Sequence, residues 1–177
     1  DMKSCEILPK RVSDLLVPLR ELINSLSLRK KLPQIELAVT DEALALVLRI
    51  LEKPTADDEA KLRQFQKNYG VDFWYQPKGP DSIYPMDPEN AARLKLHHRE
   101  TGVEVVFRPT DFTQVNHRLN EVMVTRALRL LHLEPSSKVI DFFCGLGNFT
   151  LPLATRTAKV LGIEGMHLLE RWEKEYA

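Results

Sequence analysis

A buried strand that runs directly into a glycine turn is the feature that most constrains this chain. Residues 139–143 (Val-Ile-Asp-Phe-Phe) are almost entirely apolar, and the turn 144–147 (Cys-Gly-Leu-Gly) follows at once. A second apolar run, 160–163, ends on Glu164. Glycines let a backbone approach a ligand closely, and an acid after the next strand receives ribose hydroxyls in Rossmann-like sites. The pattern predicts the opening strand–helix–strand of such a domain.

This reading fixes a topology. Strands 138–143 and 159–164 should pair in parallel through a crossover helix at 148–156. Gly145 and Gly147 should lie at the carboxyl end of the first strand, where the dipole of the following helix points at the turn. The alternative is that the two glycines only make a tight strand-to-helix connection.

The residues of the glycine turn indicate which kind of ligand it can bind. The third glycine of the dinucleotide pattern is absent, and Thr150 holds its place. Asn148 stands where a diphosphate would need an open backbone. A ligand with a carboxylate in place of a diphosphate fits better, and S-adenosylmethionine carries a carboxylate, a ribose and an adenine.

Upstream of this region the sequence predicts a small α+β unit. Apolar residues at helical spacing mark 9–29, with a kink or break at Pro18. Thr55 and Asp58 form a capping pattern, and Gly70 ends that helix. The other expected elements are a hairpin of 35–39 and 44–51, a helix over 55–69, a strand over 71–75, a loop over 77–88, a strand pair of 94–98 and 103–107, a helix over 116–131 and a last helix from about 167. We expect domains at 1–109 and 110–177.

The segment 111–116 (Asp-Phe-Thr-Gln-Val-Asn) precedes the helix that leads into the second domain. Asn116 can cap the free amides of that helix. Alternatively, Gln114 is buried and faces the ligand. The sequence leaves both possibilities open.

Composition narrows the class of protein. The 25 Lys and Arg residues balance 25 Asp and Glu residues, so net charge gives no overall case for nucleic-acid binding. The two cysteines, Cys5 and Cys144, favour a reducing cytoplasm over a disulfide scaffold. No apolar run reaches the roughly 18 residues that a membrane span needs. We expect both ends to be cut from a longer protein.

Other reactive side chains have simpler explanations. Cys144 is expected to be a small buried apolar residue, because no histidine stands near it in sequence to activate it. His97 and His98 point to opposite faces of a strand and are poor joint metal ligands. The basic residues Arg93, Lys95 and Arg99 are expected to be solvated surface.

The phrases 111–116 (Asp-Phe-Thr-Gln-Val-Asn), 139–152 and 162–165 (Gly-Ile-Glu-Gly) together resemble the RNA (uracil-5)-methyltransferases. The segment 143–152 (Phe-Cys-Gly-Leu-Gly-Asn-Phe-Thr-Leu-Pro) is far more specific than a bare glycine motif. The chain is most similar to the bacterial members that carry an iron–sulfur cluster and act on 23S ribosomal RNA. The resemblance implies a truncated Rossmann-like methyltransferase domain behind a central α+β domain.

The resemblance also implies roles for particular residues. It implies contacts with S-adenosylmethionine from Gln114, Phe143, Asn148 and Glu164, beside the turn glycines Gly145 and Gly147. Cys5 matches the last of four cysteines that hold a [4Fe-4S] cluster, and one thiolate cannot hold a cluster. The family's RNA-binding barrel, nucleophilic cysteine and general base have no match here, so we expect the fragment to be inactive.

The sequence is compatible with three functions. The first is a fragment of an RNA uridine C5-methyltransferase that acts on ribosomal RNA. The second is a non-catalytic nucleotide- or RNA-binding module, and the third is a dinucleotide-dependent oxidoreductase. Because a parallel sheet is normally covered on both faces, we also expect either self-association of the truncated chain through its open sheet edge at residues 138–177, or higher mobility there than in residues 1–109.

Overall fold

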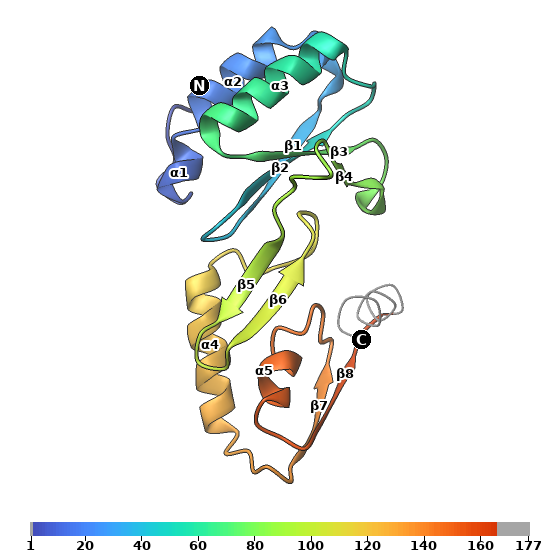
Figure 1. The fold of residues 1–177 in the computed structure, drawn as a ribbon. Helices are drawn as coiled ribbons and strands as arrows, with labels where there is room; N and C mark the ends of the chain where they lie inside the picture. The colour runs from blue at the N-terminus through green and yellow to red at the C-terminus, as the bar shows by residue number, and fades with distance from the viewer. Residues whose placement is uncertain (1, 166–177) are drawn as a thin grey trace. The chain divides into compact units, whose positions relative to one another are not determined.

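The computed structural model describes residues 2–165 and divides the chain into two compact units, 1–92 and 93–177 (Figure 1). The division by compactness lies between Ala92 and Arg93, earlier than the expected domain boundary at 109/110. The reason is that the hairpin of residues 94–107 packs against helices of the second unit. The functional boundary at 109/110 stays a prediction.

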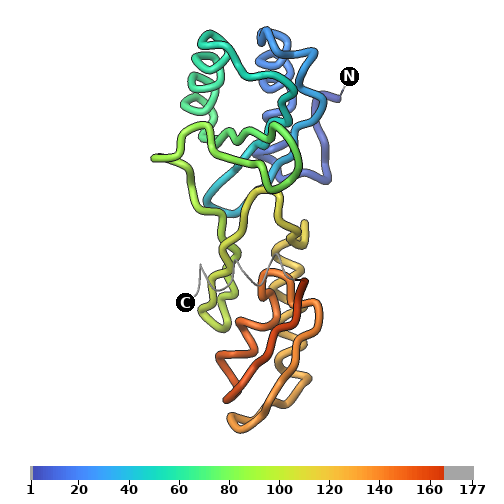
Figure 2. The backbone as a smooth tube through the Cα atoms, turned by 90° about the vertical axis from the view of Figure 1, so that its right-hand side faces the viewer, coloured from blue at the N-terminus to red at the C-terminus, as the bar shows by residue number. Residues whose placement is uncertain are grey.

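The first unit is a four-stranded sheet with helices on one side. The sheet order is β1-β2-β3-β4, with β2 and β3 parallel and the other two pairings antiparallel. Figure 2, a view perpendicular to Figure 1, shows α2 and α3 on the same side of the strands. The elements are α1 (Lys10–Ser13), α2 (Leu16–Ser25), η1 (Ser27–Lys31), β1 (Gln34–Val39), β2 (Leu44–Arg49), α3 (Ala56–Tyr69), β3 (Asp72–Gln76), η2 (Pro80–Ser82) and β4 (Tyr84–Pro85).

Most of the expected elements of this unit are confirmed, and two differ. The helix expected over 9–29 is broken at 14–15. The break was expected at Pro18, but Pro18 lies in the first turn of α2, after the break. A proline is tolerated there, since the first-turn N–H groups have no intrahelical partner. The expected loop 77–88 contains η2 and the short strand β4.

Helix α3 begins at a capping box. The Thr55 side chain accepts a hydrogen bond from the Asp58 N–H, and the Asp58 carboxylate accepts one from the Thr55 N–H. Gly70 ends the helix with a φ of 61°, a left-handed conformation that glycine adopts without strain. The apolar face of α3, Leu62 and Phe65, packs into the core of the first unit.

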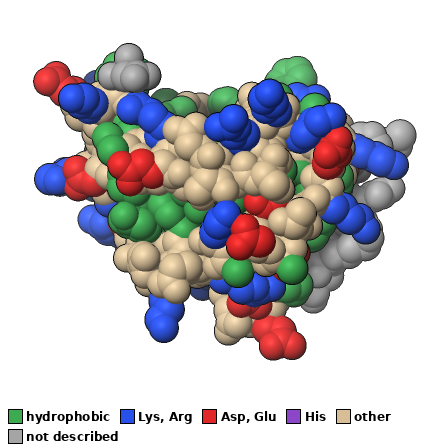
Figure 3. All heavy atoms as spheres, turned by 90° about the horizontal axis from the view of Figure 1, so that it is seen from above, with side chains coloured by type: hydrophobic (Ala, Val, Ile, Leu, Met, Phe, Trp, Pro, Cys, Tyr) green, Lys and Arg blue, Asp and Glu red, His purple; other side chains and the backbone are tan. Residues whose placement is uncertain are grey.

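The outer face of these helices carries both signs of charge. Figure 3 shows Lys and Arg side chains scattered among Asp, Glu and apolar side chains on that face. This mixture agrees with the zero net charge of the chain. In the part of the chain that the structure describes, no helix is both long and apolar enough to cross a membrane.

Between residues 93 and 165, the second unit contains two separate strand pairs and two helices. β5 and β6 form an antiparallel hairpin, as expected, and β7 and β8 pair in parallel, as expected. Figures 1 and 2 both show β7 and β8 side by side. The elements are β5 (Leu94–His98), β6 (Val103–Phe107), α4 (His117–Leu130), β7 (Lys138–Phe142), α5 (Thr150–Ala154) and β8 (Lys159–Ile163). The helix expected from about 167 lies outside the described residues.

The crossover helix is shorter than expected. α5 has five residues, where 148–156 was expected, because the glycine turn takes up the residues before Thr150. A helix of five residues has only a small dipole. The dipole of α5 therefore contributes less to ligand binding at the turn than expected from the sequence. Its residue Leu153 packs against Val124 and Leu128 of α4 in a small core.

One face of the β7–β8 pair is apolar and open. Val139 and Val160 pack against the α4–α5 core, whereas alternate residues point the other way. Those residues are Ile140, Phe142, Leu161 and Ile163, which are 40–64% exposed. We call these four side chains the open sheet face.

Candidate functional site

The turn after β7 has an unusual backbone. Phe143, Gly145 and Gly147 all have positive φ angles, of 60°, 54° and 89°. The Phe143 and Cys144 N–H groups still donate to the Ile163 carbonyl of β8, at 2.8 and 3.2 Å. The left-handed conformation of Phe143 explains why β7 stops at Phe142 rather than at 143 as expected. The turn therefore lies at the carboxyl ends of two parallel strands, where ligands bind in open α/β sheets.

The site residue Phe143 is strained and open to solvent. A left-handed conformation costs a non-glycine residue about 1–2 kcal/mol, and such strain is concentrated at functional sites. The Phe143 side chain is 89% exposed at the end of β7. An aromatic ring held in this way can pack against a flat ligand.

Gly145 leaves free space beside the turn. A Cβ atom at Gly145 would meet nothing within 4 Å, so the backbone there can be approached closely. Gly162 of β8 differs, because a Cβ there would lie 2.9 Å from the Cys144 sulfur. Glycine is needed at position 162 so that β8 can pack against Cys144. Glycine at position 145 leaves the backbone of the turn accessible to a ligand.

Glu164 reaches from the end of β8 to the turn. Its Oε1 accepts a hydrogen bond from the Gly165 N–H and its Oε2 accepts one from the Gly145 N–H, each at 2.8 Å. These two backbone hydrogen bonds lower the pKa of the carboxyl against a smaller opposing effect of burial. Glu164 is therefore ionised at neutral pH and can accept hydrogen bonds from ligand hydroxyls.

Asn148 is fixed by a residue that the sequence interpretation missed. The side-chain amides of Asn148 and Asn120 bond to each other in both directions, at 2.7 and 2.9 Å. Asn120 is buried on α4 in line with Val124 and Leu128. An asparagine within the apolar stripe of a helix was the signal that could have identified it, because a buried polar group needs a partner.

The structure decides against one expectation for Gln114. Gln114 is exposed, so the prediction that it is buried is wrong. The capping role of its neighbour is confirmed, since the Asn116 side chain accepts a hydrogen bond from the Leu119 N–H at 2.9 Å. A contact between Gln114 and a ligand stays a prediction.

Cys144 has the properties of a packed thiol. It is buried, and burial, with the negative charges of Asp141 and Glu164, raises the pKa of its thiol. A thiol is a nucleophile only as thiolate, so Cys144 is not activated. Asp141 meanwhile accepts a hydrogen bond from the Thr150 hydroxyl at 2.5 Å, which ties β7 to the start of α5.

Cys5 lies in the first unit and is half-buried. Its N–H donates to the Ser13 hydroxyl at 2.8 Å, which holds the segment before α1 in place. Among residues 2–165, no three His, Cys, Asp or Glu side chains converge into a metal-binding group.

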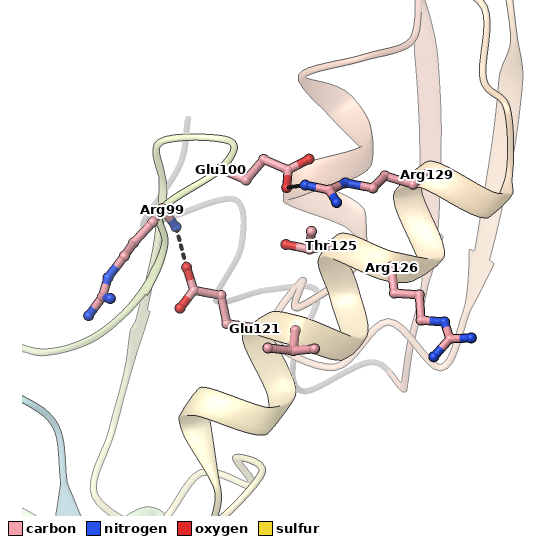
Figure 4. Close-up of a pocket in the computed structure, with 7 residues that line it drawn as sticks. Arg99, Glu100, Glu121, Thr125, Arg126 and Arg129 are labelled. Carbon is pink, nitrogen blue, oxygen red and sulfur yellow. Dashed lines mark hydrogen bonds and ion pairs between the residues drawn. The ribbon is translucent and has the colours of Figure 1, made fainter.

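A separate open cavity of about 550 Å³ lies beside α4. Figure 4 shows the Glu100 carboxylate facing Arg129 and the Glu121 carboxylate bound to the backbone of Arg99. The remaining residues that line it are Val122, Thr125 and Arg126. None of the residues predicted to bind the cofactor lines this cavity.

Relatives of known name cover nearly the whole chain. This chain is 54% identical over 169 residues to the 23S rRNA (uracil(1939)-C(5))-methyltransferase RlmD of Ralstonia pickettii. The alignment covers 96% of this chain and 37% of that protein. The RlmD of Cupriavidus necator is 56% identical, with 96% and 38% covered. The chain thus spans little more than a third of the length of these relatives.

A solved structure supports the fold, and a family profile covers most of the sequence. The Pyrococcus abyssi tRNA (uracil-54, C5)-methyltransferase, solved with S-adenosyl-L-homocysteine, aligns with a TM-score of 0.62 and 18% identity over 98% of this chain and 46% of that one. At this identity it shows the fold alone. The profile of the tRNA (uracil-5-)-methyltransferase family matches residues 2–167. The chain belongs to the tRNA (uracil-5-)-methyltransferase family.

Proposed function

We propose that the intact protein methylates C5 of a uridine in 23S ribosomal RNA and that this chain carries the first part of its S-adenosylmethionine site. The observation that carries the proposal is the ionised Glu164 carboxylate at the glycine turn, at the carboxyl ends of two parallel strands. The relatives named for this reaction are 54–56% identical over 96% of the chain. A structural neighbour was solved with the product of the same cofactor.

Each part of the turn suits one part of S-adenosylmethionine. Glu164 would accept hydrogen bonds from the ribose hydroxyls, because its carboxylate can accept more bonds than the two backbone N–H groups use. Phe143 would pack its exposed ring against the adenosyl group. The open backbone at Gly145 would let the methionine part of the ligand approach the turn closely, and Asn148 would add an amide contact.

The reaction itself is tested by the fate of the C5 hydrogen. When a methyl group replaces the hydrogen at C5, that hydrogen leaves as a proton. With 23S RNA tritiated at uridine C5, the intact protein should release one tritium for each methyl group transferred, and only with S-adenosylmethionine present. The isolated chain should release none. Methyl transfer without tritium release would show that a different atom is modified.

We propose that ribosomal RNA is the partner of the intact protein, which would place its work in the cytoplasm. For the iron–sulfur cluster of the family, we propose that Cys5 supplies one ligand. The other ligands would come from parts of the longer relatives that this chain does not cover. The iron content of the intact protein with and without Cys5→Ser checks this assignment.

The isolated chain should self-associate through the open sheet face. Exposed apolar patches and sheet edges favour pairing with another chain. Replacing Phe142 with serine should weaken that association by about 1–2 kcal/mol, because a large apolar side chain is removed from the contact. Light scattering over a concentration series measures it. Leu119→Ser, at an exposed position on α4, is the control and should change nothing. Monomeric wild-type chain at high concentration would contradict the expectation.

A further inference from the structure

The amide pair of Asn120 and Asn148 joins two segments that are far apart in sequence. The Asn120 Nδ2 donates to the Asn148 Oδ1 at 2.7 Å, and the Asn148 Nδ2 donates to the Asn120 Oδ1 at 2.9 Å. Asn120 lies on α4 and is only 4% exposed, while Asn148 lies in the turn and is half-buried. The pair therefore connects a rigid helix to the glycine turn.

The reciprocal bonding fixes which way the Asn148 amide points. An amide has two N–H groups and two lone pairs on its oxygen. One of each is used by Asn120, and His98 makes a further side-chain hydrogen bond to Asn148 that favours its charged form, so that the histidine donates to the Asn148 oxygen. Asn148 therefore keeps one N–H for another partner. If the pair were broken, the Asn148 amide could turn over and exchange the positions of its donor and acceptor.

The surroundings of the pair are polar and partly buried. His98, at the end of β5, is buried beside it, and burial lowers the pKa of that histidine against opposing effects of Glu121 and Asn148. His98 and Glu121 are the titratable groups near the pair from β5 and α4. Glu164 also contacts the turn, where its carboxylate accepts a hydrogen bond from the Gly145 N–H.

We propose that Asn120 is a positioning residue for the cofactor site: it orients the Asn148 amide so that its remaining N–H points at S-adenosylmethionine. This inference rests on the proposed function, because it assumes that the turn binds that cofactor. The competing explanation is that the pair only braces α4 against the turn and leaves ligand binding unaffected.

Titration calorimetry of the intact protein with S-adenosylmethionine tests the proposal. Asn120→Ala should weaken binding about fivefold, as expected for the loss of one oriented hydrogen bond. The matched control is Val124→Ala, one turn further along the same buried face of α4. This variant loosens the packing of α4 without touching Asn148, so it should lower thermal stability and leave cofactor affinity unchanged.

A second variant separates orientation from packing. In Asn120→Asp, the carboxylate can accept from the Asn148 N–H but repels the Asn148 oxygen. Its protonated form has the shape of asparagine and can donate again, and burial raises the pKa of such a carboxyl. The affinity of this variant relative to wild type should therefore recover as the pH is lowered from 8 to 5.5. A carboxylate at position 120 would raise the pKa of the neighbouring His98, so the series is repeated in a His98→Gln background and compared with His98→Gln alone at each pH.

The outcomes are distinguishable. Weaker binding by Asn120→Ala together with recovery of Asn120→Asp at low pH supports the positioning role. Wild-type affinity in Asn120→Ala, or a constant ratio for Asn120→Asp across the pH range, would overturn it and leave a structural brace. If Asn120→Ala does not fold, the Asn120→Asp series decides alone. If the wild-type intact protein does not bind S-adenosylmethionine, the proposed function itself fails.

Discussion

Replacing Glu164 with alanine is expected to weaken S-adenosylmethionine binding by the intact protein by about 1–3 kcal/mol, the range for leaving a hydrogen-bonding group without its partner. Glu164 is the acid at the end of β8, and its carboxylate already points at the turn through the Gly145 N–H. The substitution removes the acceptor for the ribose hydroxyls and frees the Gly145 amide. Titration calorimetry measures the change in affinity.

Two further variants make the Glu164 experiment specific. Glu164→Gln keeps one oxygen acceptor but loses the charge, so it should lie between wild type and the alanine variant. Glu134→Ala removes an exposed acid from the loop between α4 and β7 and should leave binding unchanged. Unchanged affinity in Glu164→Ala would remove this residue from the cofactor site.

The pKa of Glu164 predicts how binding responds to acid. Because hydrogen bonds from Gly165 and Gly145 lower that pKa, the carboxylate keeps its charge to a lower pH than an ordinary glutamate. The contribution of Glu164 to binding should be constant around neutral pH and should be lost only as the pH falls through the lowered pKa.

Replacing Asp58 with alanine is expected to destabilise this chain by about 1.5–3 kcal/mol, the range for hydrogen bonds to a charged group. Asp58 is fully buried and accepts hydrogen bonds from the backbone N–H groups and hydroxyls of Ser27 and Thr55, at 2.6–3.0 Å. Its loss leaves those donors without their partner. Chemical denaturation followed by tryptophan fluorescence, to which Trp74 in β3 contributes, measures the free energy of unfolding.

The effect of Asp58 should depend on pH in a defined direction. Burial raises its pKa, but the hydrogen bonds from Ser27 and Thr55 outweigh burial and lower the pKa to about 2. A carboxyl whose pKa is lower in the folded state stabilises the fold above its unfolded pKa of about 3.9. That contribution should therefore shrink as the pH falls from about 4 towards 2.

The neighbouring acid provides the control for Asp58. Asp57 lies in the same helical turn but is exposed, where it pairs with Lys61. Surface ion pairs of this kind contribute about 0–1 kcal/mol, so Asp57→Ala should have a small effect. Equal losses in the two variants would mean that the buried hydrogen bonds of Asp58 add nothing beyond its helix-terminal charge.

Local patterns predicted the elements best. The Thr55–Asp58 capping box and Gly70 fixed the ends of α3, and the apolar runs around the glycine turn fixed β7 and β8. These signals lie within a few residues of the structure that they determine. The sequence pattern placed Phe143 at the end of the strand, and its left-handed backbone was visible only in the structure. Its contact with S-adenosylmethionine was predicted through the family resemblance and stays a prediction.

Contacts between distant residues could not be predicted in the same way. The bond between Asn120 and Asn148 spans 28 positions and depends on how α4 packs against the turn. The exposure of Gln114 depends on the path of the segment before α4, which carries no periodic pattern. The grouping of β5 and β6 with the second unit depends on their packing against α4 and α5.

A crystal structure of the intact protein with S-adenosylhomocysteine would test the central claim most directly. The account predicts the ribose hydroxyls within hydrogen-bonding distance of the Glu164 carboxylate, the amino-acid part of the ligand beside the open backbone of Gly145, and the adenosyl group against the Phe143 ring. A ligand bound elsewhere, with Glu164 still bonded only to the Gly145 and Gly165 amides, would contradict it.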